Sequence, residues 1–303
     1  MLRLAVLLSA AMWSLSWTPA AAKIQVFACE PEWASLAQEI GGDRVKTTTA
    51  THAGQDAHYV RARPSLIAAV RRSDLVFCSG ADLEVGWLPV LLRKAGKQTV
   101  QPGQAGHLLA ASHVTLLETP EKLDRSLGDV HPQGNPHVHL NPHNITTLAT
   151  VLADRLSDLD PPGSAQYERN AGRFLADWRD AVAQWDQRAK ALRNMPIVVH
   201  HKAWTYLVDW LALDQVATLE PKPGLPPTTS HLTSLLQLTR TRPIRAILRT
   251  PYDPDDAAEW LANKTGIPSL QLPFTVGGDD QSGTLFLLFD RTLTLLEEAK
   301  SDR

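Results

Sequence analysis

The chain has 303 residues, of which 44% are hydrophobic and 20% charged, and its formal net charge is −2 at pH 7. This is the composition of a globular protein long enough to build two lobes with real cores. A nearly neutral charge balance gives no electrostatic reason to expect nucleic acid or an anionic membrane surface as a partner.

Residues 1–22 have the pattern of a cleaved secretory signal. Arg3 supplies the positive start, an apolar stretch follows, and small residues at 20–22 offer a cleavage site before Lys23. A membrane anchor is the alternative, but the apolar run is shorter than a bilayer span requires. The cleavage site has no cysteine, which argues against a lipid anchor there. We therefore expect a soluble, exported mature protein.

Short apolar runs alternate with helical patterns along the chain. We expect strands at residues 23–29, 45–50, 74–78 and 114–118, and again at 196–201, 215–220, 245–250 and 269–274. We expect helices at residues 31–42, 64–73, 83–96 and 144–160, and again at 202–213, 231–241, 253–266 and 284–300. This alternation predicts an α/β fold with mainly parallel sheets and crossover helices.

Residues 165–192 contain no proline and place their large apolar residues on one helical face. That face consists of Tyr167, Phe174, Trp178, Val182, Trp185, Ala189 and Leu192. At 1.5 Å per residue, such a helix is about 42 Å long, enough to run along two lobes. We predict an N-terminal lobe at residues 23–163, a linking helix at 164–194 and a C-terminal lobe at 195–303.

The chain has two cysteines, Cys29 and Cys78, and each ends an apolar, strand-like run. In an exported protein, cysteines at the ends of neighbouring strands are within reach of a disulfide. Two inert buried thiols are the alternative. Neither cysteine belongs to a CxxC pair, which makes the two less attractive as metal ligands.

Histidines stand in loops and at predicted strand ends in both halves of the chain. The stretch GNPHVHLNP places His137 and His139 in a loop that its prolines keep out of helix. Such a rigid loop can fix a metal ligand, although two solvated histidines are the alternative. His58 follows a predicted strand, and His200 and His201 end another, at the edge where parallel sheets bind ligands. His200 is assigned a core or supporting role.

A pair of carboxylates, Asp279 and Asp280, follows the last predicted strand in the loop TVGGDDQSG. If the two lobes face each other, this loop converges on the histidines. Three imidazoles and one carboxylate make a closed tetrahedral set for zinc. Either aspartate can be the fourth ligand, with Asp279 slightly favoured. In the alternative, both are surface residues and water completes the metal sphere.

Five stretches together resemble the solute-binding proteins of zinc and manganese ABC transporters, the ZnuA-like group, and within it the AztC-like zinc binders. They are QDAHYVRARPS, GNPHVHLNP, HHKAWTYLVDWL, EPKPGLPP and GIPSLQLPFTVGG. The resemblance implies two (β/α) lobes joined by a long rigid helix, with the metal in the cleft between them. Carried over by position, the ligands are His58, His137 and His201.

The resemblance also bears on accessory residues and on the choice of metal. The long acidic, His-rich insertion of many zinc-type relatives is reduced here to LGDVHPQG, so Asp129 and His131 are assigned an accessory role in passing metal inward. His139 stands where many relatives have tryptophan and is a further accessory candidate. Manganese-type relatives tend to have glutamate where this chain has His201, and nitrogen ligands favour zinc. Histidines must be neutral to bind, so zinc affinity is expected to fall below about pH 6.

We therefore expect a periplasmic, non-catalytic monomer that captures zinc with high affinity and delivers it to a membrane ABC permease, with a periplasmic metallochaperone as a further partner. A manganese-binding homologue is the nearer alternative. A zinc-dependent hydrolase is the alternative from another class, because His-x-His also occurs in amidohydrolases. It would need an open coordination position and a general base. An adhesin or metal-sequestering protein of the same fold is a third possibility.

Overall fold

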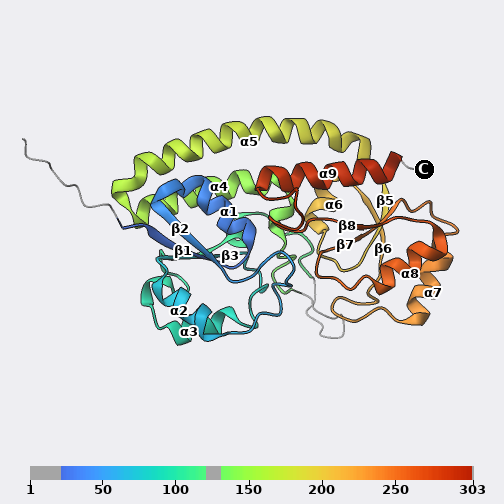
Figure 1. Ribbon diagram of the computed structural model, residues 1–303, viewed down its shortest axis with the longest axis horizontal. Coiled ribbons are helices and arrows are strands. Elements are labelled where there is room, and N and C mark those ends of the chain that lie inside the picture. The colour runs from blue at the N-terminus through green and yellow to red at the C-terminus, as the bar shows by residue number, and fades with distance from the viewer. Residues whose placement is uncertain (1–21, 121–130, 302–303) are drawn as a thin grey trace, which may run out of the picture.

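Two α/β lobes lie side by side under one long helix in the computed structural model, which describes residues 22–120 and 131–301 (Figure 1). Residues 1–21 of the predicted signal, and Asp129, lie outside the described residues. Within the described ranges, no helix combines the length and hydropathy that crossing a bilayer demands.

The N-terminal sheet is parallel throughout, with strand order β2-β1-β3-β4. Its strands are β1 (Ile24–Ala28), β2 (Val45–Thr49), β3 (Leu75–Cys78) and β4 (His107–Leu109). Its helices are α1 (Pro31–Gly41), α2 (Pro64–Arg72), α3 (Leu88–Ala95) and α4 (Pro142–Leu159). Each of these helices has a proline in its first two positions, where the missing N–H has no helical acceptor in any case. The prolines thus define where each loop ends and its helix begins.

The C-terminal sheet repeats this arrangement, with parallel strands in the order β6-β5-β7-β8. Its strands are β5 (Pro196–Val199), β6 (Asp214–Thr218), β7 (Ala246–Arg249) and β8 (Ser269–Gln271). Its helices are α6 (Thr205–Leu211), α7 (Thr229–Leu238), α8 (Asp256–Thr265) and α9 (Leu285–Ser301). The predicted α/β class, with a parallel sheet in each lobe, is confirmed.

The predicted strand at residues 114–118 is wrong. The fourth strand of the N-terminal sheet is β4, and residues 114–118 form a non-sheet segment that crosses toward the C-terminal lobe. Leu116 and Leu117 pack against the core, and the Leu117 N–H donates to the hydroxyl of Tyr206 on α6 at 3.1 Å. Their apolar character therefore serves packing between the lobes and not strand pairing.

The long helix α5 (Ser164–Leu192) lies along both lobes, as predicted (Figure 1). It packs against α1 and α4 on the N-terminal side and against α6 and α9 on the C-terminal side. Trp178 stacks on Phe174 at 5.2 Å between ring centroids, and Trp185 stacks on Phe289 of α9 at 5.2 Å. A single core cluster includes buried residues of both sheets and of this helix. Because close-packed interiors resist deformation, the shared core holds the two lobes at a fixed angle.

Candidate metal centre

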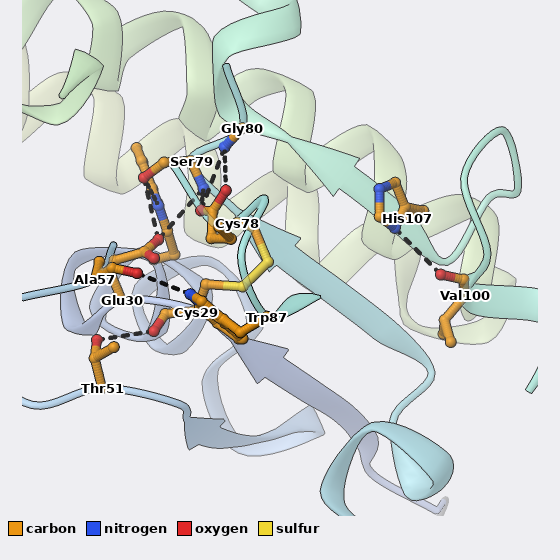
Figure 2. The surroundings of a disulfide bond; sticks show 12 residues. Cys29, Glu30, Thr51, Ala57, Cys78, Ser79, Gly80, Trp87, Val100 and His107 are labelled. Atoms are coloured by element: carbon orange, nitrogen blue, oxygen red, sulfur yellow. Dashed lines mark hydrogen bonds between the residues drawn. A yellow bond between two sulfur atoms is a disulfide. The ribbon is translucent and has the colours of Figure 1, made fainter. Parts of the chain in front are cut away.

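His58 lies in the loop that follows β2, and neighbouring groups hold that loop in place. Trp87 Nε1 donates to the backbone carbonyl of Ala57, the residue before His58, at 2.8 Å (Figure 2). Asp56 Oδ1 accepts from the backbone N–H of His58 at 2.9 Å and lies 2.7 Å from His58 Nδ1. A carboxylate only accepts, so Nδ1 carries the proton and Nε2 is left to bind a metal.

His201 reaches the same place from the C-terminal lobe, two residues beyond β5. Its Nδ1 lies 2.7 Å from Oε2 of Glu220, which also accepts the backbone N–H of Gly224 at 3.0 Å. The ring centroids of His58 and His201 are 6.1 Å apart. Each of these two histidines is thus oriented by a carboxylate at Nδ1, with Nε2 left over.

His137 is buried behind these two rings, in the loop that precedes α4. Its backbone N–H donates to Oδ1 of Asn135 at 3.1 Å, and the Asn135 amide donates to the carbonyl of Lys202 at 2.9 Å, which ties the loop to the C-terminal lobe. The ring centroid of His137 lies 5.6 Å from that of His58. Burial, and then the charges of the neighbouring histidines, hold the pKa of His137 well below its usual value. The ring is therefore neutral and has a lone pair for a metal.

His131 completes the group. Its Nε2 lies 3.1 Å from Nε2 of His58, and the two ring centroids are 5.2 Å apart. Two nitrogens on one tetrahedral zinc are about 3.4 Å apart, and their ring centroids about 5 Å apart, given the usual Zn–N length. The centroid distances from His58 to His131, His137 and His201 are 5.2, 5.6 and 6.1 Å. Each is within about 1 Å of the distance in a closed zinc site.

A cavity of about 130 Å³ between the lobes reaches His58 and His201. Its acidic lining residues are Asp56, Glu220 and Asp253. Burial alone would raise the pKa of Asp56. The hydrogen bond with His58 and the charge of His58 outweigh burial and hold this pKa below its usual value. An anionic, partly enclosed cavity raises the local concentration of cations beside the histidines.

The predicted carboxylate ligands have other surroundings. Asp279 Oδ2 accepts from Nε of Arg291 on α9 at 2.9 Å, and Oδ1 accepts from the backbone N–H of Gln281 at 3.0 Å. The side chain of Asp280 is exposed. Arg291 supplies a cation on α9, and Asp279 pairs with it while also binding the backbone of its own loop. The hydrogen-bond partners of the Asp279 carboxylate are therefore Arg291 and Gln281, and not the histidines.

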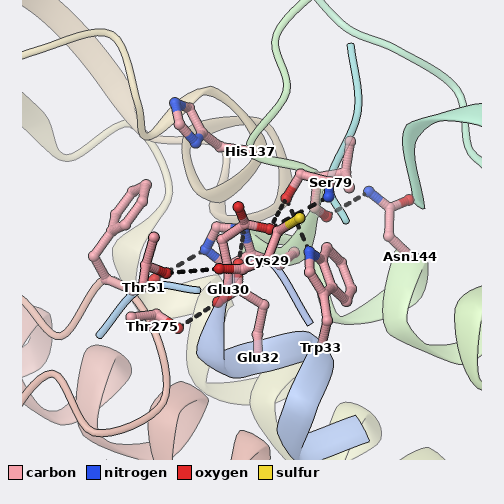
Figure 3. A network of polar contacts seen from close by, with 12 residues as sticks. Cys29, Glu30, Glu32, Trp33, Thr51, Ser79, His137, Asn144 and Thr275 are labelled. Atoms are coloured by element: carbon pink, nitrogen blue, oxygen red, sulfur yellow. Dashed lines mark hydrogen bonds and ion pairs between the residues drawn. The ribbon is translucent and has the colours of Figure 1, made fainter. Parts of the chain in front are cut away.

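Figure 3 shows a buried polar network that includes Glu32 and Thr275. His139 belongs to this network, and its ring centroid lies 6.4 Å from that of His137. Its Nε2 donates to the carbonyl of Phe274 at 2.9 Å, and its Nδ1 lies 3.2 Å from Oε1 of Glu32. Glu32 also accepts a hydrogen bond from the hydroxyl of Thr275. Nε2 of His139 thus has a hydrogen-bond partner in the other lobe, whereas Nδ1 faces the Glu32 carboxylate without a hydrogen bond among the described residues. An accessory metal role for His139 stays a prediction.

Cys29 and Cys78 form a disulfide, with Cα atoms 4.8 Å apart, as predicted (Figure 2). The bridge connects the ends of the neighbouring strands β1 and β3. A carboxylate oxygen of Glu84 and the two sulfurs of the disulfide all lie within 4.8 Å of one another. Sulfurs in a disulfide have no thiolate to offer, so this trio is not a metal centre.

Two buried glutamates next to the disulfide were missed from the sequence. Glu84 accepts the backbone N–H of Ser79 at 2.8 Å and of Gly80 at 3.1 Å, and Glu30 accepts from Ser79 Oγ at 3.1 Å. Burial raises the pKa of Glu84 to about 7. Burial and the charge of Glu84 raise the pKa of Glu30 well above its usual value. Glu30 stands directly after the apolar run IQVFAC, and this position could have indicated a buried carboxylate.

We expect the folded protein to lose stability as the pH rises through about 7. The folded-state pKa of Glu84 is above its unfolded value, so its contribution is present at low pH and lost on deprotonation. Urea unfolding at several pH values between about 4.5 and 8 measures this slope, which should level off above about 7. Glu84→Gln should flatten it, whereas Glu298→Gln, at an exposed position of α9, should leave it unchanged. An equally steep slope in Glu84→Gln would contradict the assignment.

The chain matches the family model described as zinc-uptake complex component A, periplasmic (ZnuA), over residues 26–299. Among its relatives is the metal ABC transporter substrate-binding lipoprotein FimA of Streptococcus parasanguinis. It is 23% identical over 265 residues, which cover 84% of this chain and 81% of FimA. The manganese ABC transporter substrate-binding lipoprotein PsaA of Streptococcus pneumoniae is 23% identical, over 84% of this chain and 80% of PsaA. The zinc-binding lipoprotein AdcA of Streptococcus pneumoniae strain R6 is 24% identical, over 75% of this chain and 44% of AdcA.

Solved structures share the fold. The crystal structure of ZnuA superposes with a TM-score of 0.74 at 22% identity, covering 90% of this chain and 99% of that one. The Mn-bound periplasmic metal binding protein of Candidatus Liberibacter asiaticus gives a TM-score of 0.73 at 19% identity, covering 91% and 100%. Since the family model spans nearly all the described residues, the chain belongs to the family of the periplasmic zinc-uptake complex component A.

Proposed function

We propose that this chain is the substrate-binding component of a metal importer, which captures zinc between its lobes and delivers it to a membrane ABC permease. The observation that carries the proposal is the gathering of His58, His131, His137 and His201 from both lobes beside an anionic cavity. Family membership supports the same function. The protein performs no reaction, and the metal is its cargo.

The donor set favours zinc over manganese. Imidazole nitrogens suit zinc, whereas manganese prefers carboxylate and carbonyl oxygens. The nearby carboxylates of Asp56 and Glu220 bind the Nδ1 atoms of histidines and so orient the rings. In this proposal, His131 takes the fourth position that was expected for Asp279. Four protein ligands leave no open position for a catalytic water, which separates this site from that of a zinc hydrolase.

Acid should release the metal. Burial alone would lower the pKa of His201. The hydrogen bond with Glu220 and the charge of Glu220 outweigh burial and raise this pKa above its usual value. Protons compete with zinc for this ring, so affinity falls as the pH falls. The loss should begin at a higher pH than the value of about 6 expected for an unperturbed histidine.

The test of the function is a competitive titration of zinc against manganese on the purified mature protein. We expect one zinc per chain and a clear preference for zinc. His131→Ala should weaken zinc binding strongly, whereas Asp279→Asn should have little effect. If manganese bound more tightly than zinc, or if Asp279→Asn were the costly change, the proposed donor set would be wrong.

The carboxylates that orient the histidines should matter almost as much as some ligands. Glu220→Gln and Asp56→Asn should each weaken zinc binding by about 10- to 100-fold. Glu220→Gln should also move the pH midpoint of zinc binding downward, because it removes the charge that raises the pKa of His201. Isothermal titration at pH 6 and pH 7.5 measures both effects. Glu259→Gln on the exposed side of α8 is the matched control, and a Glu220→Gln protein with wild-type affinity and midpoint would contradict this role.

The same proposal includes the cellular location, the oligomeric state and the partners of the protein. Residues 1–22 direct export, the mature chain works as a monomer in the periplasm, and it is divided at residues 23–163, 164–194 and 195–303. The partner is the permease of the importer, and a metallochaperone is a second candidate. Fractionation of cells that produce the full chain, followed by N-terminal sequencing of the mature protein, tests the location and the cleavage site together.

A further inference from the structure

A second cavity in the C-terminal lobe shares Glu220 and Gly224 with the cavity at the histidines. It has a volume of about 510 Å³, which falls within the range of ligand pockets. It lies among α7, α8 and the loop after β6, and Figure 1 shows α7 and α8 on the side of the sheet away from α5 and α9. Apart from Glu220 and Gly224, no residue that lines this cavity takes part in the proposed capture of zinc.

The lining of this pocket is suited to a cation on an apolar stem. Its charged lining residues, Glu220 and Asp256, are both acids, and Trp260 and three prolines supply aromatic and apolar walls. A guanidinium pairs with carboxylates, stacks on indole and keeps its charge at all physiological pH values. The N-terminal dipole of α8 opposes a cation there, but the first turn of this helix carries Asp256 and Glu259, which offset it.

His200 adds a ring nitrogen, Nδ1, that accepts no hydrogen bond from residues 22–120 and 131–301. Its ring lines the pocket, only 4% of the residue is exposed, and its Nδ1 has no hydrogen-bond partner in that part of the chain. Leaving a buried polar atom unpaired is costly. A planar group with several N–H donors could pair with Glu220 and still donate to this nitrogen.

We propose that this pocket receives an arginine side chain of the protein that takes the metal. Glu220 is the connection between the two cavities, because the oxygen that holds His201 Nδ1 also accepts from Gly224 in the wall of the pocket. An arginine that pairs with Glu220 competes with His201 for that carboxylate. Docking then loosens a zinc ligand at the moment of transfer. The identity of the partner and this consequence both rest on the proposed function, whereas the binding of a guanidinium group in the pocket does not.

Binding is tested on the full mature protein with N-acetyl-arginine methylamide as the probe. The readout is the indole N–H signal of Trp260 in a 1H–15N spectrum, assigned with Trp260→Phe. We expect a saturable shift with the probe and binding at least about tenfold weaker for the citrulline analogue, which has the same shape without the charge. Asp256→Asn should weaken the probe and leave zinc affinity unchanged. No saturable shift, or equal binding of citrulline, would overturn the proposal.

Two further arms test the source of the cation and its effect. Free arginine, with its charged backbone groups, should bind no more tightly than the blocked probe, because a protein side chain has no such groups. Tighter binding of free arginine would instead make this a small-molecule site and contradict the proposal. By linkage, saturating probe should lower zinc affinity by about 5- to 150-fold, and zinc should lower probe affinity by the same factor. Unchanged zinc affinity would refute the release role, and a zinc titration without probe tests the proposed function separately.

Discussion

Replacing His137 with alanine should weaken zinc binding by more than about 100-fold, beyond the effect of losing an orienting residue. The ring is neutral, buried and 5.6 Å from His58 between centroids, so its loss removes a donor that water cannot replace without opening the site. His58→Ala and His201→Ala should be similarly costly. Competitive zinc titration measures the affinities, and circular dichroism confirms the fold.

The matched control is His143→Ala, because that histidine lies near the start of α4 with its side chain 56% exposed. It should bind zinc as the wild type does. His201 is more exposed than His137, so His201→Ala keeps the experiment decisive if the buried substitution impairs folding. Wild-type affinity in His201→Ala would show that the metal binds elsewhere.

Removing the disulfide should give the second large effect. The bridge closes a loop with a sequence separation of 49 residues, which corresponds to about 4 kcal/mol in the chain-entropy account. A double Cys29→Ser, Cys78→Ser protein should therefore lose a sizeable part of a typical folding free energy of about 5–15 kcal/mol. Urea unfolding of the variant and the oxidised wild type measures the difference.

Thiol labelling supplies the accompanying control. Denatured, unreduced protein from an oxidising compartment should show no free thiol, because the described structure contains no free cysteine. Two labelled thiols, or a double variant as stable as the wild type, would contradict a stabilising bridge.

Local sequence patterns were enough to predict most of the fold. The face of α5 is visible because its buried residues recur at helical spacing, and the strands are visible as short apolar runs with glycine or proline nearby. β4 was missed because it has three residues, His107–Leu109, within a Gly- and His-rich stretch. Residues 114–118 were assigned wrongly because apolar packing between lobes has the same local pattern as a strand.

The histidines at strand ends were predictable for a topological reason. Parallel strands place their carboxyl ends at one edge, so His58 and His201 could be expected there before their separation was known. The surroundings of Asp279 depend on Arg291 on the following helix, α9, and a short sequence pattern does not relate the two residues. The contact of His131 with His58 spans 73 residues, so no local pattern relates the two histidines. Contacts of this kind set the direction of a loop, and a local sequence pattern does not contain them.

The most direct test of the central claim is X-ray absorption at the zinc edge on the protein loaded with one zinc per chain. Four nitrogen neighbours at about 2.0–2.1 Å, with the multiple scattering of at least three imidazoles, are the expected result. The histidine site between the lobes predicts no sulfur neighbour, because both cysteines are in the disulfide. Sulfur at about 2.3 Å, or a mainly oxygen shell without imidazole scattering, would contradict it.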